Sequence, residues 1–203
     1  MQLPGPPLWR SVISAGSFEA CGRLGVPILT ARLPVERIKE RWAIYEKGLI
    51  AGGHDEAKRR RLMEQSALWR NVYVADSDAQ AEDELAALLT ETRDHLIHMR
   101  QALNPADFTV DPAHLNAWND PNVSNEVAVA ENLKFGSLYG SPDRVREQVA
   151  ELRDVGVRHL LCQTGFGAMS HERNIASMRR FGEQVMPVFR QQAAEEPKMR
   201  RLA

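Results

Sequence analysis

Two serines, Ser14 and Ser17, flank Ala15 and Gly16 at the point where an apolar run gives way to a helical pattern. Serine hydroxyls and the free backbone amides of a helix start are groups that bind phosphate, and the helix dipole favours a negative charge there. The pattern is therefore compatible with an anion site formed by these four residues. The alternative is that Ser17 only caps the helix, with Glu19 close by. The residues alone leave both interpretations open.

A second candidate is the segment Thr164–His171, which follows the last predicted strand. Its two glycines predict a mobile loop, and Phe166 and Met169 offer apolar surface to a flat ring or an aliphatic substrate. His171 is the group in this segment that could exchange a proton near neutral pH, so it is the candidate catalytic residue. The alternative is a plain connection in which Ser170 caps the final helix.

Two further patterns favour structural roles. Ser141, Pro142 and Asp143 could start a second anion-binding helix, but the carboxylate of Asp143 would repel an anion, so a helix cap is expected. Three residues at metal-ligand spacing share one helical face. Because that helix is expected on the outer, solvent-facing layer, we predict no metal site there; the three are Glu91, His95 and His98.

Composition limits the possible partners. The chain has 203 residues, 43% of them hydrophobic, and a net charge of −1, so nothing global directs it to nucleic acid or to an anionic membrane. The basic run 58–61 is expected on a solvated helical face. The two cysteines, Cys21 and Cys162, cannot form a disulfide framework, and the start of the chain lacks a signal-peptide pattern. A cytoplasmic protein is predicted.

Short apolar runs alternate with helical periodicity, which is typical of an α/β protein with a mostly parallel sheet. Strands are predicted at residues 8–13, 26–30, 71–75 and 159–163, and helices at 35–51, 78–103, 142–155 and up to Met186–Pro187. Residues 104–138 show little periodicity and are expected to be an irregular excursion. Residues 191–203 are expected to be a frayed polar tail, after a single domain over residues 1–190.

Four strands with helical crossovers are half of a (β/α)8 barrel, which needs about 250 residues. An open sheet of four strands would leave two edges without hydrogen-bonded neighbours and one apolar face exposed to solvent, which a soluble protein avoids. We therefore predict the C-terminal half of a (β/α)8 TIM barrel.

Several short motifs occur in the order found in the luciferase-like flavin monooxygenases. Residues 6–9, 14–17 and 24–29 resemble that family's fifth strand, phosphate loop and sixth strand, and residues 72–81 resemble its seventh strand and the following helix. Residues 139–145 resemble the helix start before its eighth strand, and residues 166–167 and 181–187 its closing loop and last helix. Segments corresponding to the first four strands of the family are not found.

The resemblance implies a monooxygenase that uses reduced FMN and O2 on a small organic substrate, with a flavin reductase as a possible partner. Ser14 and Ser17 match positions that hold the FMN phosphate, and Phe166 would line the ring. A homo-oligomer or a missing N-terminal half would complete the barrel. Two alternatives stay open: an oxidoreductase of the same superfamily that uses coenzyme F420, and a non-catalytic barrel fragment that serves as a binding module.

Overall fold

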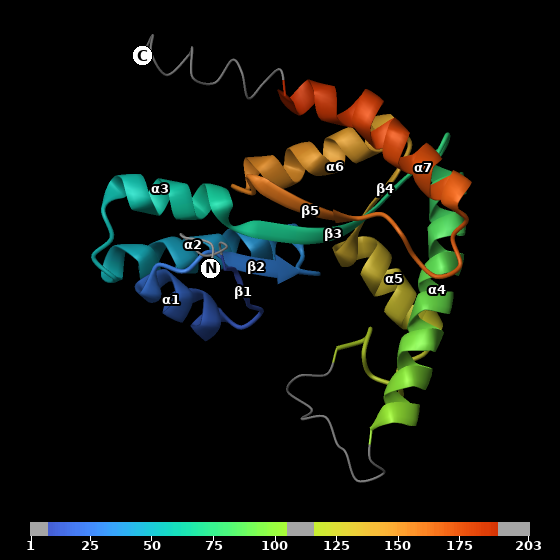
Figure 1. The fold of residues 1–203 in the computed structure, drawn as a ribbon, viewed down its shortest axis with the longest axis horizontal. Helices are drawn as coiled ribbons and strands as arrows, with labels where there is room; N and C mark the ends of the chain where they lie inside the picture. The colour runs from blue at the N-terminus through green and yellow to red at the C-terminus, as the bar shows by residue number, and fades with distance from the viewer. Residues whose placement is uncertain (1–7, 105–115, 191–203) are drawn as a thin grey trace, which may run out of the picture. The chain divides into compact units, whose positions relative to one another are not determined.

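The computed structural model describes residues 8–104 and 116–190, in which parallel strands are flanked by helices (Figure 1). It contains two compact units. The first comprises Met1–Arg70 and Val149–Cys162, and the second comprises Asn71–Gln148 and Gln163–Ala203. The predicted α/β class and partial barrel are confirmed by the parallel sheet and its helices.

The sheet of the first unit is built from neighbouring parallel strands. β1 (Arg10–Ser11) pairs with β2 (Ile28–Ala31), with Arg10 opposite Ile28. β2 pairs with the first part of β3 (Ala67–Val74), and β5 (His159–Gln163) also pairs with β3. His159 Nδ1 lies 3.1 Å from the carbonyl oxygen of Gln65, so β5 starts level with the start of β3. Because β2 already occupies one edge of β3 there, β5 lies along the other edge.

The described part of the first unit contains α1 (Ala15–Leu24), α2 (Val35–Ala51), α3 (Glu56–Gln65) and the last part of α6 (Pro142–Asp154). The first two pack with their backbones in close approach at Gly22 and Gly48. A Cβ atom on Gly22 would stand 2.9 Å from the Cα of Gly48, and one on Gly48 would stand 3.1 Å from the Cα of Gly22. Glycine at both positions is therefore what allows α1 and α2 to pack this closely.

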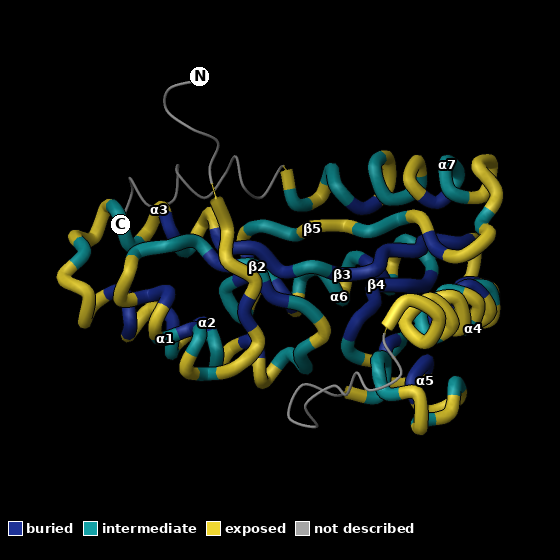
Figure 2. The backbone as a smooth tube through the Cα atoms, turned by 60° about the horizontal axis from the view of Figure 1, so that its bottom comes forward, coloured by how far each residue is buried: buried dark blue, intermediate teal, exposed yellow. Residues whose placement is uncertain are grey.

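In the second unit, β3 pairs in parallel with β4 (Ser137–Gly140), with Tyr73 opposite Tyr139. The helices are α4 (Asp78–Leu103), α5 (Asn125–Gly136), the first part of α6 (Pro142–Asp154) and α7 (His171–Arg180), which continues into a π-helical turn, η2 (Phe181–Val185). Both tyrosines lie in a core cluster with apolar residues of α4, among them Leu85 and Leu89. Figure 2 shows β3 buried along most of its length, whereas β5 is half-buried or exposed.

Three features differ from the sequence-based prediction. β4 was not predicted, because a strand of only four residues gives little periodic signal. β3 starts at Ala67, four residues before the predicted start. α5 occupies the last part of the stretch that the sequence predicts to be irregular; its buried residues include Asn132 and Gly136, so it lacks a continuous apolar stripe.

The final helix also continues past its predicted end at Pro187. Residues 186–190 are helical, and the N–H of Met186 donates to the carbonyl oxygen of Phe181, five residues earlier. This π-type turn shifts the hydrogen-bond register just before Pro187, a residue that has no N–H to donate. Parts of three predictions lie outside the described residues: the motif residues 6–7, residues 105–115 of the excursion and the tail 191–203.

Candidate functional site

Ser14 and Ser17 meet at the carboxyl end of β1. Pairing of β1 with β2 extends to Val12, whose N–H donates to the carbonyl oxygen of Leu29 at 2.9 Å. Ser14 follows as the N-cap of α1, and its Oγ accepts from the N–H of Ser17 at 3.4 Å. The hydroxyl oxygens of the two serines are 2.9 Å apart. Both predicted hydroxyls therefore converge at one helix start.

The start of α1 carries no negative charge of its own. Its first turn contains no acidic residue, and Glu19 is paired with Arg23 at 3.0 Å. A Cβ atom on Gly16 would meet no other atom within 4 Å, and Ser14 and Gly16 are exposed. The first N–H groups of a helix have no partner inside the helix. The hydroxyls, free amides and positive end of the dipole are thus accessible and fit a phosphate group.

The capping interpretation also holds, with a change of residue. The alternative interpretation placed the cap at Ser17, but Ser14 is the cap, because the extended backbone of Ser14 (φ −75°, ψ 147°) precedes the first helical residue. The Glu19 carboxylate accepts hydrogen bonds from Arg23, one turn further along α1. A helix cap and an anion site can exist together, because the capping hydrogen bond uses the N–H of Ser17 and does not involve the N–H groups of Ala15 and Gly16.

A cation lies at the same edge of the first unit and was not predicted. Arg32 follows β2 directly and has a φ of 51°, the one positive φ of a non-glycine residue in the described ranges. Its guanidinium carbon is 5.7 Å from the centre of the Trp69 ring. The predicted strand ended at Thr30, and a strand end followed by arginine was the signal that could have identified this residue.

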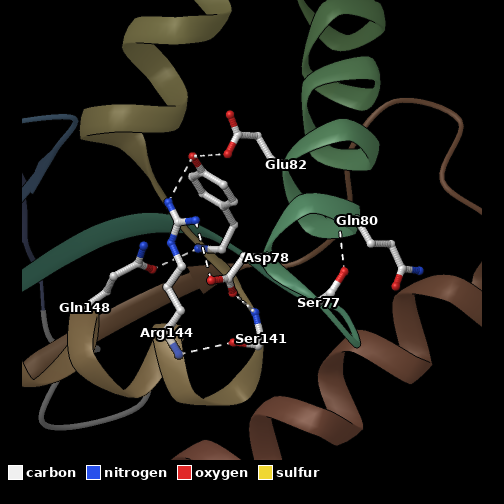
Figure 3. A network of polar contacts seen from close by, with 8 residues as sticks. Ser77, Asp78, Gln80, Glu82, Ser141, Arg144 and Gln148 are labelled. Carbon is white, nitrogen blue, oxygen red and sulfur yellow. Dashed lines mark hydrogen bonds and ion pairs between the residues drawn. The ribbon is translucent and has the colours of Figure 1, made fainter.

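The other proposed anion site is already satisfied by the protein itself (Figure 3). The Asp78 carboxylate accepts from the N–H of Ser141 at 2.7 Å, and Ser141 Oγ accepts from the N–H of Arg144. The hydrogen bonds that Asp78 accepts from the backbone and the side chain of Ser141, together with the charge of Arg144, lower the pKa of Asp78. Arg144 also lies over the ring of Tyr139, 4.8 Å from its centre. Ser141 is therefore a structural cap, as predicted.

The segment after β5 is packed against α4. Phe166 is 3% exposed and belongs to the core cluster of the second unit, so the surface that the sequence predicted it to offer to a ring is buried. The N–H of Ala168 donates to Glu91 Oε2 at 2.8 Å, which ties down the loop that was expected to be mobile. Gly167, at φ 45°, allows this turn. His171 is exposed at the start of α7, directly after Ser170, which caps that helix.

A buried arginine on α4 was also not predicted. Arg93 is 4% exposed, and its guanidinium gathers the segment 117–125 of the second unit. It donates to four carbonyl oxygens at 2.7–3.3 Å and to one side-chain oxygen: those of Ala117, Trp118, Asp120, Val123 and, through Oδ1, Asn125. Arginine on a helix is usually solvated, so this role could not be predicted from the sequence.

The family model of the luciferase-like monooxygenases matches residues 1–159. The chain belongs to the luciferase-like monooxygenase family. A comparison with curated proteins finds no match. Within the described ranges, no helix combines the length and apolar character needed to cross a bilayer.

Solved structures similar to this luciferase-like chain confirm the fold. The monooxygenase RslO1 from Streptomyces bottropensis is 21% identical, with a TM-score of 0.60 over 93% of this chain and 50% of that one. The oxygenating constituent of 3,6-diketocamphane monooxygenase from Pseudomonas putida, in complex with FMN, is 18% identical with a TM-score of 0.57, over 90% of this chain and 49% of that one.

An F420-dependent relative has a similar TM-score at a lower sequence identity. The coenzyme F420-dependent tetrahydromethanopterin reductase from Methanopyrus kandleri is 13% identical, with a TM-score of 0.58 over 90% of this chain and 51% of that one. The luciferase-like chain thus spans about half the length of the structures it matches.

Proposed function

We propose that this chain is the FMN-binding part of a luciferase-like monooxygenase, which oxygenates a small organic substrate with O2. The observation that carries the proposal is the acid-free start of α1, where the Ser14 and Ser17 hydroxyls converge at the carboxyl end of β1. In parallel α/β proteins, ligands bind at this end of the strands.

The residues of this chain bind and orient the cofactor. Ser14 and Ser17 hydroxyls and the amides of Ala15 and Gly16 hold the phosphate, and Arg32 supplies a positive charge at the same edge. Reduced FMN, when bound, supplies the oxygen chemistry, and a flavin reductase is the proposed source of reduced FMN. Phe166 has no place in this proposal because it is buried. No acid or base is assigned beyond the exposed candidate His171.

Fluorescence titration with FMN and with riboflavin, which lacks the phosphate, tests the site. FMN should bind more tightly than riboflavin, and replacing Ser14 and Ser17 with alanine should remove most of that difference. The expected loss for FMN is about 1–3 kcal/mol, the scale of hydrogen bonds to charged groups. Equal affinity of the chain for FMN and riboflavin would refute the phosphate site.

A matched control separates binding from helix capping. Ser124 caps α5 in the second unit, where its Oγ accepts from the N–H of Val127 at 3.4 Å, the same distance as in the Ser14 cap. Ser124→Ala should therefore cost a similar amount of stability, about 1 kcal/mol. It should leave FMN affinity unchanged, whereas the Ser14 and Ser17 variant should not.

A coenzyme F420-dependent oxidoreductase is the second candidate. It is supported by the similar TM-score of the F420-dependent reductase, and the same helix start suits any phosphate-bearing cofactor. Titration with F420 beside FMN distinguishes the two, because the true cofactor should saturate at the lower concentration. A cytoplasmic location remains part of the proposal, supported by the two free cysteines, Cys21 and Cys162.

A further inference from the structure

Two consecutive residues of β3 contact the turn that follows β2. The centre of the Trp69 ring is 5.7 Å from the guanidinium carbon of Arg32. The guanidinium of Arg70 donates to the carbonyl oxygen of Leu33 at 2.7 Å. Arg70 is 3% exposed, and burial lowers the pKa of its guanidinium to about 10, so it stays charged at neutral pH. Both residues of the turn are therefore held by side chains of β3.

The backbone of this turn is restricted as well. Arg32 has a φ of 51°, a conformation that glycine adopts at less cost than any residue with a Cβ atom. Leu33 precedes Pro34, and a residue before proline is limited to extended conformations. An arginine in a conformation that favours glycine indicates that its side chain has a role there.

The strand register brings Arg32 to the level of Ser14. β1 and β2 pair in parallel, and the N–H of Val12 extends this pairing by donating to the carbonyl oxygen of Leu29. In that register Val12 stands level with Thr30, and Ser14 stands level with Arg32. Neighbouring strands lie about 4.8 Å apart. Both side chains are exposed, so a long cationic side chain and the Ser14 hydroxyl occupy the same end of two adjacent strands.

We infer that Trp69, on a turn fixed by Arg70, positions Arg32 to bind the phosphate of the cofactor beside Ser14, and that Arg32 thereby strengthens the preference of the site for a phosphorylated flavin. The inference rests on the proposed function, because it takes the start of α1 as the phosphate site. An arginine can stack on an aromatic ring and donate to a phosphate through the edge of its guanidinium at the same time. Holding the side chain in place beforehand reduces the entropy lost on binding.

Titration of each variant with FMN and with riboflavin tests the role of Arg32. The ratio of the two affinities cancels any change of the fold that affects both flavins alike. Arg32→Gln should lower the preference for FMN roughly tenfold, the effect of one hydrogen bond between charged groups. Arg32→Lys keeps the charge and should lose less. Arg60→Gln is the control, because Arg60 is exposed on α3, which leads to the amino end of β3, and it should leave the preference unchanged.

Variants of Trp69 test the positioning role. Trp69→Leu should lower the preference for FMN about two- to fivefold, the scale of an exposed cation–π contact. Trp69→Phe keeps an aromatic ring and should retain most of the preference. In a chain that already carries Arg32→Gln, Trp69→Leu should have no further effect on the preference, because Trp69 acts through Arg32.

The outcomes separate this inference from the proposed function. A wild-type chain that binds FMN and riboflavin equally overturns both. A preference for FMN that survives Arg32→Gln overturns this inference alone, as does a Trp69→Leu effect that persists without Arg32. An equal loss of FMN and riboflavin affinity in Trp69→Leu also overturns it, because the indole would then contact the flavin ring. Thermal unfolding checks that each variant is folded, and Arg32→Gly, which tolerates the φ of 51°, replaces Arg32→Gln if that variant is unfolded.

Discussion

Replacing Gly16 with glutamate tests the phosphate site. The new carboxylate should raise the free energy of unfolding and weaken the binding of FMN. Gly16 is the second residue of α1, and a Cβ atom there would meet no other atom within 4 Å. Replacing a helical glycine with a good helix former such as alanine or glutamate stabilises by roughly 0.5–1 kcal/mol. A carboxylate in the first turn adds about 0.3–1 kcal/mol at low salt through the helix dipole. Gly16→Glu should therefore raise the free energy of unfolding by about 1–2 kcal/mol.

The same carboxylate should oppose a bound phosphate. A charge of −1 about 6 Å from a phosphate of nearly −2, at an effective dielectric constant of about 40, costs ~2–3 kcal/mol. That energy corresponds to a roughly 30- to 140-fold loss of FMN affinity, since 1.4 kcal/mol is a factor of ten. Gly16→Gln is the matched control, because it has nearly the same size and no charge.

Thermal unfolding measures the stability of the wild type, Gly16→Glu and Gly16→Gln, and titration with FMN measures the affinity of each. The helix-cap interpretation alone predicts the gain in stability and no loss of affinity. A Gly16→Glu protein that binds FMN as tightly as Gly16→Gln would refute the placement of the phosphate at α1. Salt should reduce the difference between the two variants if they differ through exposed charges.

Two further predictions concern the fold. Gly22→Ala should lower the free energy of unfolding, measured by urea denaturation, by about 1–3 kcal/mol, because the new methyl group would clash with backbone atoms of α2. Gly16→Ala is the control and should not lower the free energy of unfolding. Asp78 has a pKa below its ordinary value of 3.8, chiefly because Ser141 donates hydrogen bonds to it. A lowered carboxyl pKa stabilises the fold above pH 3.8 and stops doing so as the pH falls through the lowered value. The difference in melting temperature between wild type and Asp78→Asn should thus vanish in acid; a difference that persists near pH 2 would contradict this assignment.

Helix ends were predictable where the signal is local. Ser77 and Ser141 mark the starts of α4 and α6, and Gly52 follows the end of α2, because capping residues act through their own backbone neighbourhood. The convergence of the Ser14 and Ser17 hydroxyls at the start of α1 was predictable for the same reason, because both lie within four consecutive residues.

Features that depend on distant partners were not predictable. In α5, Asn132 is buried because its side chain accepts from Asn71, 61 residues away in sequence, so a polar residue stands where periodicity requires an apolar one. Phe166 is flanked by glycines, a pattern typical of an exposed loop. It becomes part of the core because Glu91 on α4 binds the amide of Ala168 and holds the loop inward.

The hydrogen bonds from Arg93 to the segment 117–125 have a consequence for mutational tolerance. Four of its five acceptors are main-chain carbonyl oxygens, which every amino acid provides, and Asn125 is the one side chain that takes part. The four carbonyl contacts therefore do not depend on which side chains the segment carries. Substitutions that keep Asn125 and the local hydrogen bonds of Asp120 and Ser124 should leave these contacts in place, whereas loss of Arg93 would remove all five acceptors' partner at once.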